Sequence, residues 1–208
     1  MIAIIDYGAG NLRSVVNAMN KLGYQPKVTS SPHDLLDAQA VILPGVGAAA
    51  DTMVNLKEKG LDKSLSRFIS DDRPFLGICI GLQVLFTDTE EGGRHPCLDI
   101  IPGTVRKLPC GLKIPHIGWN QVEQKLSHPI FDGIPDEANF YFLHSYYAEP
   151  DDISLVAGET EYGIPICSVL IRGNLVATQF HPEKSGDLGL RFYENFIKMA
   201  LSSKVNSV

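Results

Sequence analysis

The stretch "PFLGICIGLQ", residues 74–83, holds a cysteine between two glycines, where an apolar run gives way to a helix-compatible run. Two interpretations of Cys79 are open. It is either a small core residue, because free cysteine is among the most buried residue types, or a nucleophile on a sharp strand-to-helix turn. In such a nucleophile elbow the backbone is strained, and flanking glycines such as Gly77 and Gly81 avoid side-chain clashes. The local pattern does not distinguish the two interpretations, so the position of Cys79 in the fold has to decide between them.

Two other apolar runs also end in glycine-rich turns. "IAII" at 2–5 leads into "DYGAGN", and "VILPG" at 41–45 leads into "VGAAAD". Helical patterns follow at 12–22, 51–59 and 61–70, and strands that alternate with helices predict a doubly wound parallel sheet. Ligands bind outside the carboxyl ends of such strands. Cys79 therefore lies where an elbow requires it, and we expect the site to be exposed at this strand end.

The second half of the chain is richer in strand patterns. Strands are predicted at 104–108, 116–123, 140–147 and 154–158, a hairpin at 167–180, and a last helix at 187–201. The length suits one domain, residues 1–208. The predicted fold is thus a single-domain α/β protein with a mixed, mostly parallel sheet, flanking helices and a nucleophile elbow.

Composition and charge exclude several classes of protein. The 208 residues carry 18 basic and 24 acidic side chains, a net charge of −6, which argues against a nucleic-acid partner. The N-terminus meets Asp6 too early for a signal peptide, and no apolar stretch reaches the ~20 residues of a membrane span. We therefore expect a cytoplasmic protein with no membrane partner. None of the four cysteines belongs to a C-x-x-C pair, so no metal, cofactor or disulfide is expected.

A nucleophilic thiol needs a base, and the best candidate is His181 in "QFHPEKSG". Pro182 biases His181 toward an extended conformation, in which residues two apart face the same side. Glu183 would then orient the imidazole, as the acid does in a Ser-His-Asp triad. The alternative is that His-Pro-Glu forms a capped surface turn. Of the other histidines, His116 and His144 lie in strand patterns and could line the site or pack, whereas His33, His95 and His128 lie in polar turns.

Several blocks together resemble a known family. "GICIGLQ" and "HPE" resemble the class I, or triad-type, glutamine amidotransferases, and five further blocks resemble the glutaminase subunits within that family that serve histidine biosynthesis. These blocks span nearly the whole chain: "DYGAGNLRSV" at 6–15, "LPGVGAAAD" at 43–51, "PHIGWN" at 115–120, "YFLHSYY" at 141–147 and "QFHPEKSG" at 179–186.

The resemblance implies a Cys-His-Glu triad that splits L-glutamine into glutamate and ammonia. Cys79 would be the nucleophile, His181 the general base and acid, and Glu183 its orienting partner. Gln83, one turn into the elbow helix, would contact the bound glutamine. The ammonia would pass to a separate (βα)₈-barrel cyclase subunit, because this chain carries no second catalytic domain.

The resemblance also implies substrate, oxyanion and interface residues. Gly47 and the backbone of Ser145 and Tyr146 would hold the amino-acid end of the substrate or the oxyanion. The oxyanion hole would involve Val46 and Gly47, but valine resists positive φ, so an N–H could point away until the peptide flips. The candidate interface residues, Asn11 and Lys184, could equally be a helix N-cap and a solvated lysine.

Two other functions remain open at the level of sequence. One is a free-standing γ-glutamyl hydrolase with the same triad, which would not depend on a partner. The other is a non-enzymatic relative on the same fold, which would lack a hyper-reactive thiol.

Overall fold

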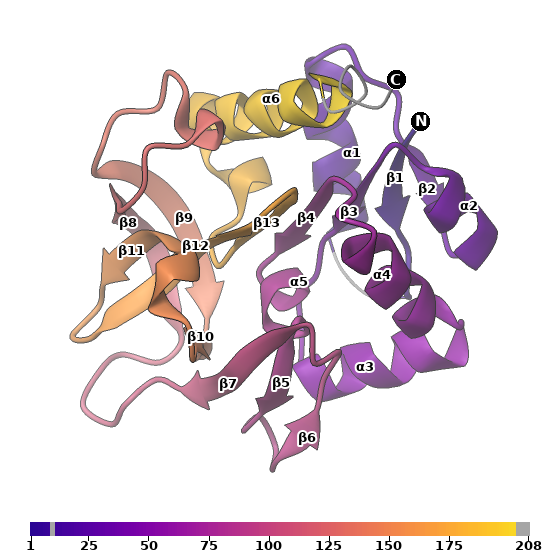
Figure 1. Cartoon of the computed structure of the whole chain (residues 1–208). Coiled ribbons are helices and arrows are strands. Elements are labelled where there is room, and N and C mark those ends of the chain that lie inside the picture. Colours follow the sequence, from indigo (N-terminus) through magenta and orange to yellow (C-terminus); the bar gives the residue numbers. More distant parts are fainter. Residues whose placement is uncertain (9–10, 203–208) are drawn as a thin grey trace.

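The computed structural model describes residues 1–8 and 11–202, and its centre is a nine-stranded sheet (Figure 1). The strand order is β2-β1-β3-β4-β13-β12-β11-β8-β9. The strands are β1 (Ile2–Ile5), β2 (Lys27–Thr29), β3 (Ala40–Leu43), β4 (Phe75–Ile78), β8 (His116–Gln124), β9 (Ala138–His144), β11 (Val156–Glu161), β12 (Pro165–Arg172) and β13 (Leu175–Thr178). A smaller sheet, in the order β10-β7-β5-β6, contains β5 (Phe86–Thr89), β6 (His95–Pro96), β7 (Ile101–Lys107) and β10 (Tyr146–Pro150).

The large sheet is mixed, as expected. Among the described residues, four strand pairs from β2 to β13 are parallel. The four pairs from β13 to β9 are antiparallel. Parallel pairing is therefore less extensive than the sequence suggested, because the β12–β13 hairpin brings the C-terminal half into the same sheet in the opposite sense.

Helices cover both faces of the sheet, and each face has its own apolar core (Figure 1). One core joins α1 and α6 to the sheet through residues such as Met19 and Phe192. The other joins α2, α3 and α4 through residues such as Leu56 and Phe68. The helices are α1 (Leu12–Lys21), α2 (Pro32–Asp37), α3 (Ala49–Glu58), α4 (Leu61–Ser70), α5 (Ile80–Gln83) and α6 (Gly186–Ser202), with 3-10 turns η1 (Pro129–Phe131), η2 (Ile153–Leu155) and η3 (Pro182–Lys184).

Two elements near the site are shorter than the sequence suggested. The helix predicted after the elbow, α5, spans only Ile80–Gln83, because the chain turns at once into β5 of the small sheet. The continuous strand predicted at 140–147 is broken at Ser145. Residues before the break pair with β8 in the large sheet, and residues after it pair with β7 in the small sheet.

The ends of the two terminal helices also differ slightly from expectation. Asn11 precedes α1 as predicted, but its side chain accepts a hydrogen bond from the Ser14 hydroxyl (2.7 Å) and caps no backbone N–H. The last helix, predicted at 187–201, begins one residue earlier, at Gly186, and ends at Ser202. Across residues 1–8 and 11–202, no helix combines the length and the apolar character that a membrane span needs.

Candidate active site

The turn after β4 has the geometry of a nucleophile elbow. Cys79 has φ 52° and ψ −101°, a backbone conformation that is strained for any residue with a side chain. A Cβ atom at Gly77 would lie 2.5 Å from the Gly81 carbonyl oxygen, and one at Gly81 would lie 2.0 Å from the Leu43 carbonyl oxygen. The two glycines thus permit a backbone approach that no larger residue allows, which explains why they flank the cysteine.

His181 and Glu183 form a buried pair beside Cys79. Nδ1 of His181 lies 2.9 Å from Oε1 of Glu183, and each side chain is 1% exposed. Nδ1 donates to the carboxylate, so Nε2 is the unprotonated nitrogen of the neutral ring. Nε2 is buried and has no hydrogen-bond partner, which leaves it able to accept a proton. The extended segment after β13 therefore places His181 and Glu183 on one side, as the sequence predicted.

The electrostatics favour a proton on His181. Burial alone would lower the pKa of the imidazole, but the neighbouring Cys79 sulfur and the Glu183 carboxylate outweigh burial and raise that pKa above its usual value. Behind the pair, Oε2 of Glu183 and the hydroxyl of Tyr193 are both buried without a partner. Burial raises the pKa of Tyr193 well above its usual value, and the nearby Glu183 carboxylate raises it further. The Glu183 carboxylate is therefore buried and aimed at the imidazole.

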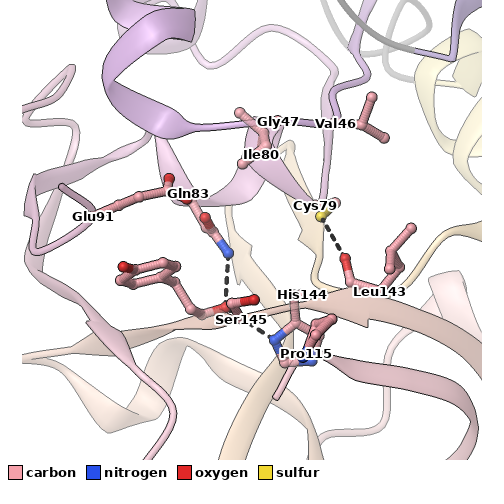
Figure 2. Close-up of a pocket in the computed structure, with 11 residues that line it drawn as sticks. Val46, Gly47, Cys79, Ile80, Gln83, Glu91, Pro115, Leu143, His144 and Ser145 are labelled. Atoms are coloured by element: carbon pink, nitrogen blue, oxygen red, sulfur yellow. Dashed lines mark hydrogen bonds between the residues drawn. The ribbon is translucent and has the colours of Figure 1, made fainter.

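The expectation that the site is exposed at the strand end is wrong. Cys79 is only 3% exposed and is one of the residues that line a pocket of about 210 Å³ (Figure 2). The end of β9 in the large sheet and the start of β10 in the small sheet lie over the elbow, where the Leu143 carbonyl oxygen is 3.7 Å from the Cys79 sulfur. The pocket is lined by Val46, Gly47, Cys79, Ile80, Gln83, Glu91, Pro115, Leu143, His144, Ser145 and Tyr146.

Gln83, the predicted substrate contact, lines this pocket. Both N–H groups of its amide already donate hydrogen bonds within the protein. Nε2 donates to the Tyr146 carbonyl (2.9 Å; Figure 2) and to Oε1 of Gln179 (3.1 Å). Nε2 of Gln179 in turn lies 3.6 Å from the Cys79 sulfur. Sequence reasoning missed Gln179, although it lies two residues before His181 and the same alternation turns it toward Cys79.

His144 lines the pocket, whereas His116 packs between Phe142 and Tyr162, and a hydrogen-bond chain fixes the tautomers of both rings. Nδ1 of His144 faces the Tyr146 carbonyl at 2.9 Å and must donate, so its Nε2 accepts from Nδ1 of His116 at 2.9 Å. Burial lowers the pKa of His144 to about 3 and that of His116 to about 4. Both rings are therefore neutral, and neither has a free nitrogen facing Cys79 to compete with His181.

The loop proposed for the oxyanion hole lies across the pocket from the β9–β10 junction. Gly47 has φ 109°, in the region that favours glycine, whereas Val46 lies outside that region. The valine is therefore not strained here, and the unusual backbone conformation is at the neighbouring glycine. Ser145 and Tyr146 lie in the pocket lining as predicted, but the Tyr146 carbonyl is already occupied by Gln83 and His144.

Glu91 is a lining residue that the sequence did not reveal. Its Oε2 accepts a hydrogen bond from the Ala49 N–H (2.8 Å) at the start of α3, which holds the carboxylate at the pocket rim. Nothing in the local sequence "TEEGG" distinguishes Glu91 from a solvated loop residue. Only the packing of β5 and its following turn against α3 places the carboxylate at the pocket.

The two candidate interface residues lie outside the pocket lining. The Lys184 ammonium lies 5.7 Å from the centroid of the Tyr141 ring, and Tyr141 meets Trp119 edge to face at 6.0 Å. Lys184 is thus more than a freely solvated lysine. Asn11 lies at the start of α1, a helix that packs against η3.

Comparisons with known proteins agree with this fold. The family model described as glutamine amidotransferase class-I matches residues 3–199. Among solved structures, PurLQS from Thermotoga maritima superposes with a TM-score of 0.77 at 16% identity, over 95% of this chain and 97% of that chain. At this identity the likeness concerns the fold alone.

Curated relatives are much closer in sequence. The chain is 58% identical over 204 residues to imidazole glycerol phosphate synthase subunit HisH of Dehalococcoides mccartyi strain 195, covering 98% of this chain and 100% of the relative. It is 54% identical to the HisH subunit of Chloroflexus aurantiacus, with 95% of each chain covered. The chain therefore belongs to the class I glutamine amidotransferase family and, within it, to the HisH subunits of imidazole glycerol phosphate synthase.

Proposed function

We propose that this protein hydrolyses L-glutamine to L-glutamate and ammonia, as the glutaminase subunit of imidazole glycerol phosphate synthase in histidine biosynthesis. The observation that carries the proposal is the strained Cys79 at the elbow, next to an imidazole whose Nδ1 is held by Glu183 at 2.9 Å and whose Nε2 has no partner. A thiol on a nucleophile elbow, an oriented base and a pocket of about 210 Å³ are the parts that acyl transfer requires.

The reaction would run in two halves. The Cys79 sulfur forms a bond to the carboxamide carbon while its proton passes to Nε2 of His181. His181 then gives that proton to the leaving nitrogen, the C–N bond breaks, and ammonia departs from a glutamyl thioester. A water molecule adds to the thioester, losing a proton to His181, and the C–S bond breaks to release glutamate and restore the thiol. Glu183 stabilises the imidazolium in both halves.

The pocket lining would recognise the rest of glutamine by charge and hydrogen bonding. Glu91 would pair with the α-ammonium group, because it brings a carboxylate to the rim. Both N–H groups of the Gln83 amide are occupied, so Gln83 would contact glutamine through its oxygen. Backbone N–H groups of Ser145 and Tyr146 would hold the α-carboxylate, and Gly47 would line the site opposite them. The Val46–Gly47 peptide would supply the oxyanion donor.

The partner would be a (βα)₈-barrel cyclase that receives the ammonia and forms imidazole glycerol phosphate and aminoimidazole carboxamide ribotide. We propose that it docks on the outer face of β8 and β9, which carries two large exposed apolar side chains, Ile117 (54% exposed) and Trp119 (58%). Across the strands these residues pair with Leu143 and Tyr141, and Leu143 also lines the Cys79 pocket. This outer face thus runs from the pocket to solvent, the route that ammonia would need.

The proposal also covers the domain boundaries, the cyclase contacts and the cellular compartment of the protein. Residues 1–208 would act as one glutamine amidotransferase domain. Lys184, against Tyr141, would contact the cyclase at the edge of the docking face, and Asn11 would contact it at the start of α1. The four cysteines are unpaired, which suits the reducing cytoplasm.

The test is to purify the chain alone and together with the cyclase from the same organism. Glutamate release and formation of the two cyclase products are measured with glutamine or with ammonium salt. We expect Cys79→Ser to abolish the glutamine-dependent reaction and to leave the ammonium-dependent synthesis intact. Equal glutamate release with and without cyclase would instead favour a free-standing γ-glutamyl hydrolase. An unreactive Cys79 together with no glutamate release would favour a non-enzymatic protein.

A further inference from the structure

Gln179 is a buried polar residue that the proposed mechanism does not use. Its side chain is 0% exposed, and both ends of its amide are engaged. Oε1 accepts from Nε2 of Gln83 at 3.1 Å, and Nε2 lies 3.6 Å from the Cys79 sulfur, within the range of a sulfur hydrogen bond. A buried amide that reaches the nucleophile has a chemical consequence, because a thiolate is stabilised by donors around it.

The local backbone explains why this side chain faces the sulfur. Gln179 follows β13 directly, and its main-chain N–H donates to the Ser168 carbonyl at 2.9 Å. Side chains alternate in this segment, so Phe180 points into the core, where it stacks on Phe140 with ring centroids 4.2 Å apart. Gln179 and His181 consequently face the elbow together.

The neighbours of Gln179 also fix which end of its amide meets the sulfur. The two N–H bonds of the Gln83 amide point to the Tyr146 carbonyl and to Gln179. The group of Gln179 nearest Gln83 must therefore be its oxygen, and its NH₂ must face Cys79. Reversing the Gln179 amide would set two NH₂ groups against each other and turn a carbonyl oxygen toward the nucleophile.

We infer that Gln179 donates a hydrogen bond to the Cys79 sulfur and stabilises its thiolate form, a role separate from proton removal by His181. The inference rests on the proposed function, because it concerns the same nucleophile. His181 and Glu183 provide a place for the proton, whereas Gln179 stabilises the charge that remains on sulfur. A neutral donor is suited to this task because it takes no proton and brings no charge of its own into a buried site.

The test is a pH titration of the Cys79 thiol in Gln179→Glu. This nearly isosteric change places a carboxylate beside the sulfur, and a like charge disfavours the thiolate. The rate of Cys79 alkylation by iodoacetamide is followed against pH by mass spectrometry of the Cys79 peptide, with the exposed Cys110 as internal reference. We expect the alkylation midpoint to rise by about one pH unit or more. Gln25→Glu, the same change at an exposed position, should leave the midpoint in place.

The other titratable groups near the sulfur are the same in Gln179→Glu and in Gln25→Glu. A difference between their alkylation midpoints therefore reports on position 179 alone. These groups are His181 and Glu183 after β13, His144 at the end of β9, Tyr7 after β1 and Glu91 at the pocket rim. Thermal unfolding of each variant shows whether it folds.

Gln179→Met is the second variant, because it keeps the volume but removes both hydrogen bonds. We expect a smaller upward shift of the midpoint and, with the cyclase present, a kcat that falls about tenfold while KM changes much less. Folded variants whose alkylation midpoint equals that of the wild type would overturn the inference and leave Gln179 as packing. A shifted midpoint in a chain without glutaminase activity would keep the inference and refute the proposed function, since alkylation requires no glutamine.

Discussion

Glu183→Gln should slow glutamine hydrolysis about a hundredfold to a thousandfold without changing the geometry of the site. The carboxylate lies 2.9 Å from Nδ1 of His181, and both side chains are 1% exposed, so solvent screens the pair weakly. Unit charges about 4 Å apart at an effective dielectric constant of about 20 interact by about 4 kcal/mol. Losing that interaction should lower the pKa of His181 by up to about three units, and most of the loss should appear in kcat.

The loss should stay below that of a triad whose imidazole is held in the wrong tautomer, which costs about ten-thousandfold in serine proteases. The reason lies behind the carboxylate. In Glu183→Gln, the amide oxygen can keep accepting from Nδ1 of His181 while its NH₂ turns toward the Tyr193 hydroxyl, which has no hydrogen-bond partner. Tyr193→Phe removes that acceptor. It should have little effect alone but deepen the loss in the Glu183→Gln background.

The assay is steady-state glutamate release by the complex with cyclase, measured over a range of pH for both single variants and the double variant. Glu194→Gln makes the same chemical change at an ion-paired position on α6 and serves as the control. An unchanged kcat in Glu183→Gln would refute the stabilisation of the imidazolium by Glu183. If the effects of Glu183→Gln and Tyr193→Phe on kcat are strictly additive, the Tyr193 hydroxyl does not hold the amide in the Glu183→Gln variant.

Four further outcomes are expected. Cys79→Ala should abolish glutamate release and leave the circular dichroism spectrum unchanged. Gly81→Ala should lower the thermal unfolding midpoint strongly, because its Cβ would lie 2.0 Å from a backbone oxygen that cannot move freely. Burial lowers the pKa of His144 to about 3, so the unfolded chain alone takes up this proton as the pH falls below about 6.5. Stability should therefore decrease below that pH, and His144→Gln should flatten the decrease in denaturant titrations. Val46→Gly should leave glutamate release by the isolated chain unchanged, because Val46 lies outside the left-handed region and the positive φ is at Gly47. A rise of about a hundredfold, the effect of an oxyanion donor worth ~3 kcal/mol, would contradict this and mean that Val46 holds the donor in the wrong orientation.

The sequence predicted those parts of the site that depend on local rules. The elbow follows from an apolar strand, a cysteine and two glycines, and the strand and its turn are where the pattern placed them. The pairing of His181 with Glu183 follows from the alternation of an extended segment and the restraint imposed by Pro182. In both cases the residues that decide the geometry lie within a few positions of one another.

The parts that escaped prediction depend on strand pairing between distant segments. No residue type marks the break at Ser145, because the break arises where β9 pairs with β8 in one sheet and β10 pairs with β7 in the other. That crossing covers the elbow and makes the site buried rather than exposed. Glu91 was missed because it reaches the pocket only through Ala49, which is far away in the sequence. The alternation that places His181 also gives the direction of Gln179, but its contact with the Cys79 sulfur depends on the pairing of β13 with β4.

The two glycine-rich turns "PGVG" and "GICIG" lie 30 residues apart, yet the packing makes them one unit. The Leu43 carbonyl, just before the first turn, occupies the space that a side chain at Gly81 would need. A Cβ at Gly45 would lie 2.9 Å from Cβ of Ile80, the residue after the nucleophile. The glycines of each turn thus leave room for atoms of the other turn. The Val46–Gly47 peptide therefore cannot move away from Cys79 unless β3 and β4 separate. A change in the Val46–Gly47 peptide therefore has to be a local rotation of that peptide. On one side Gly45 is packed against Ile80, and on the other the Ala49 N–H is bonded to Glu91.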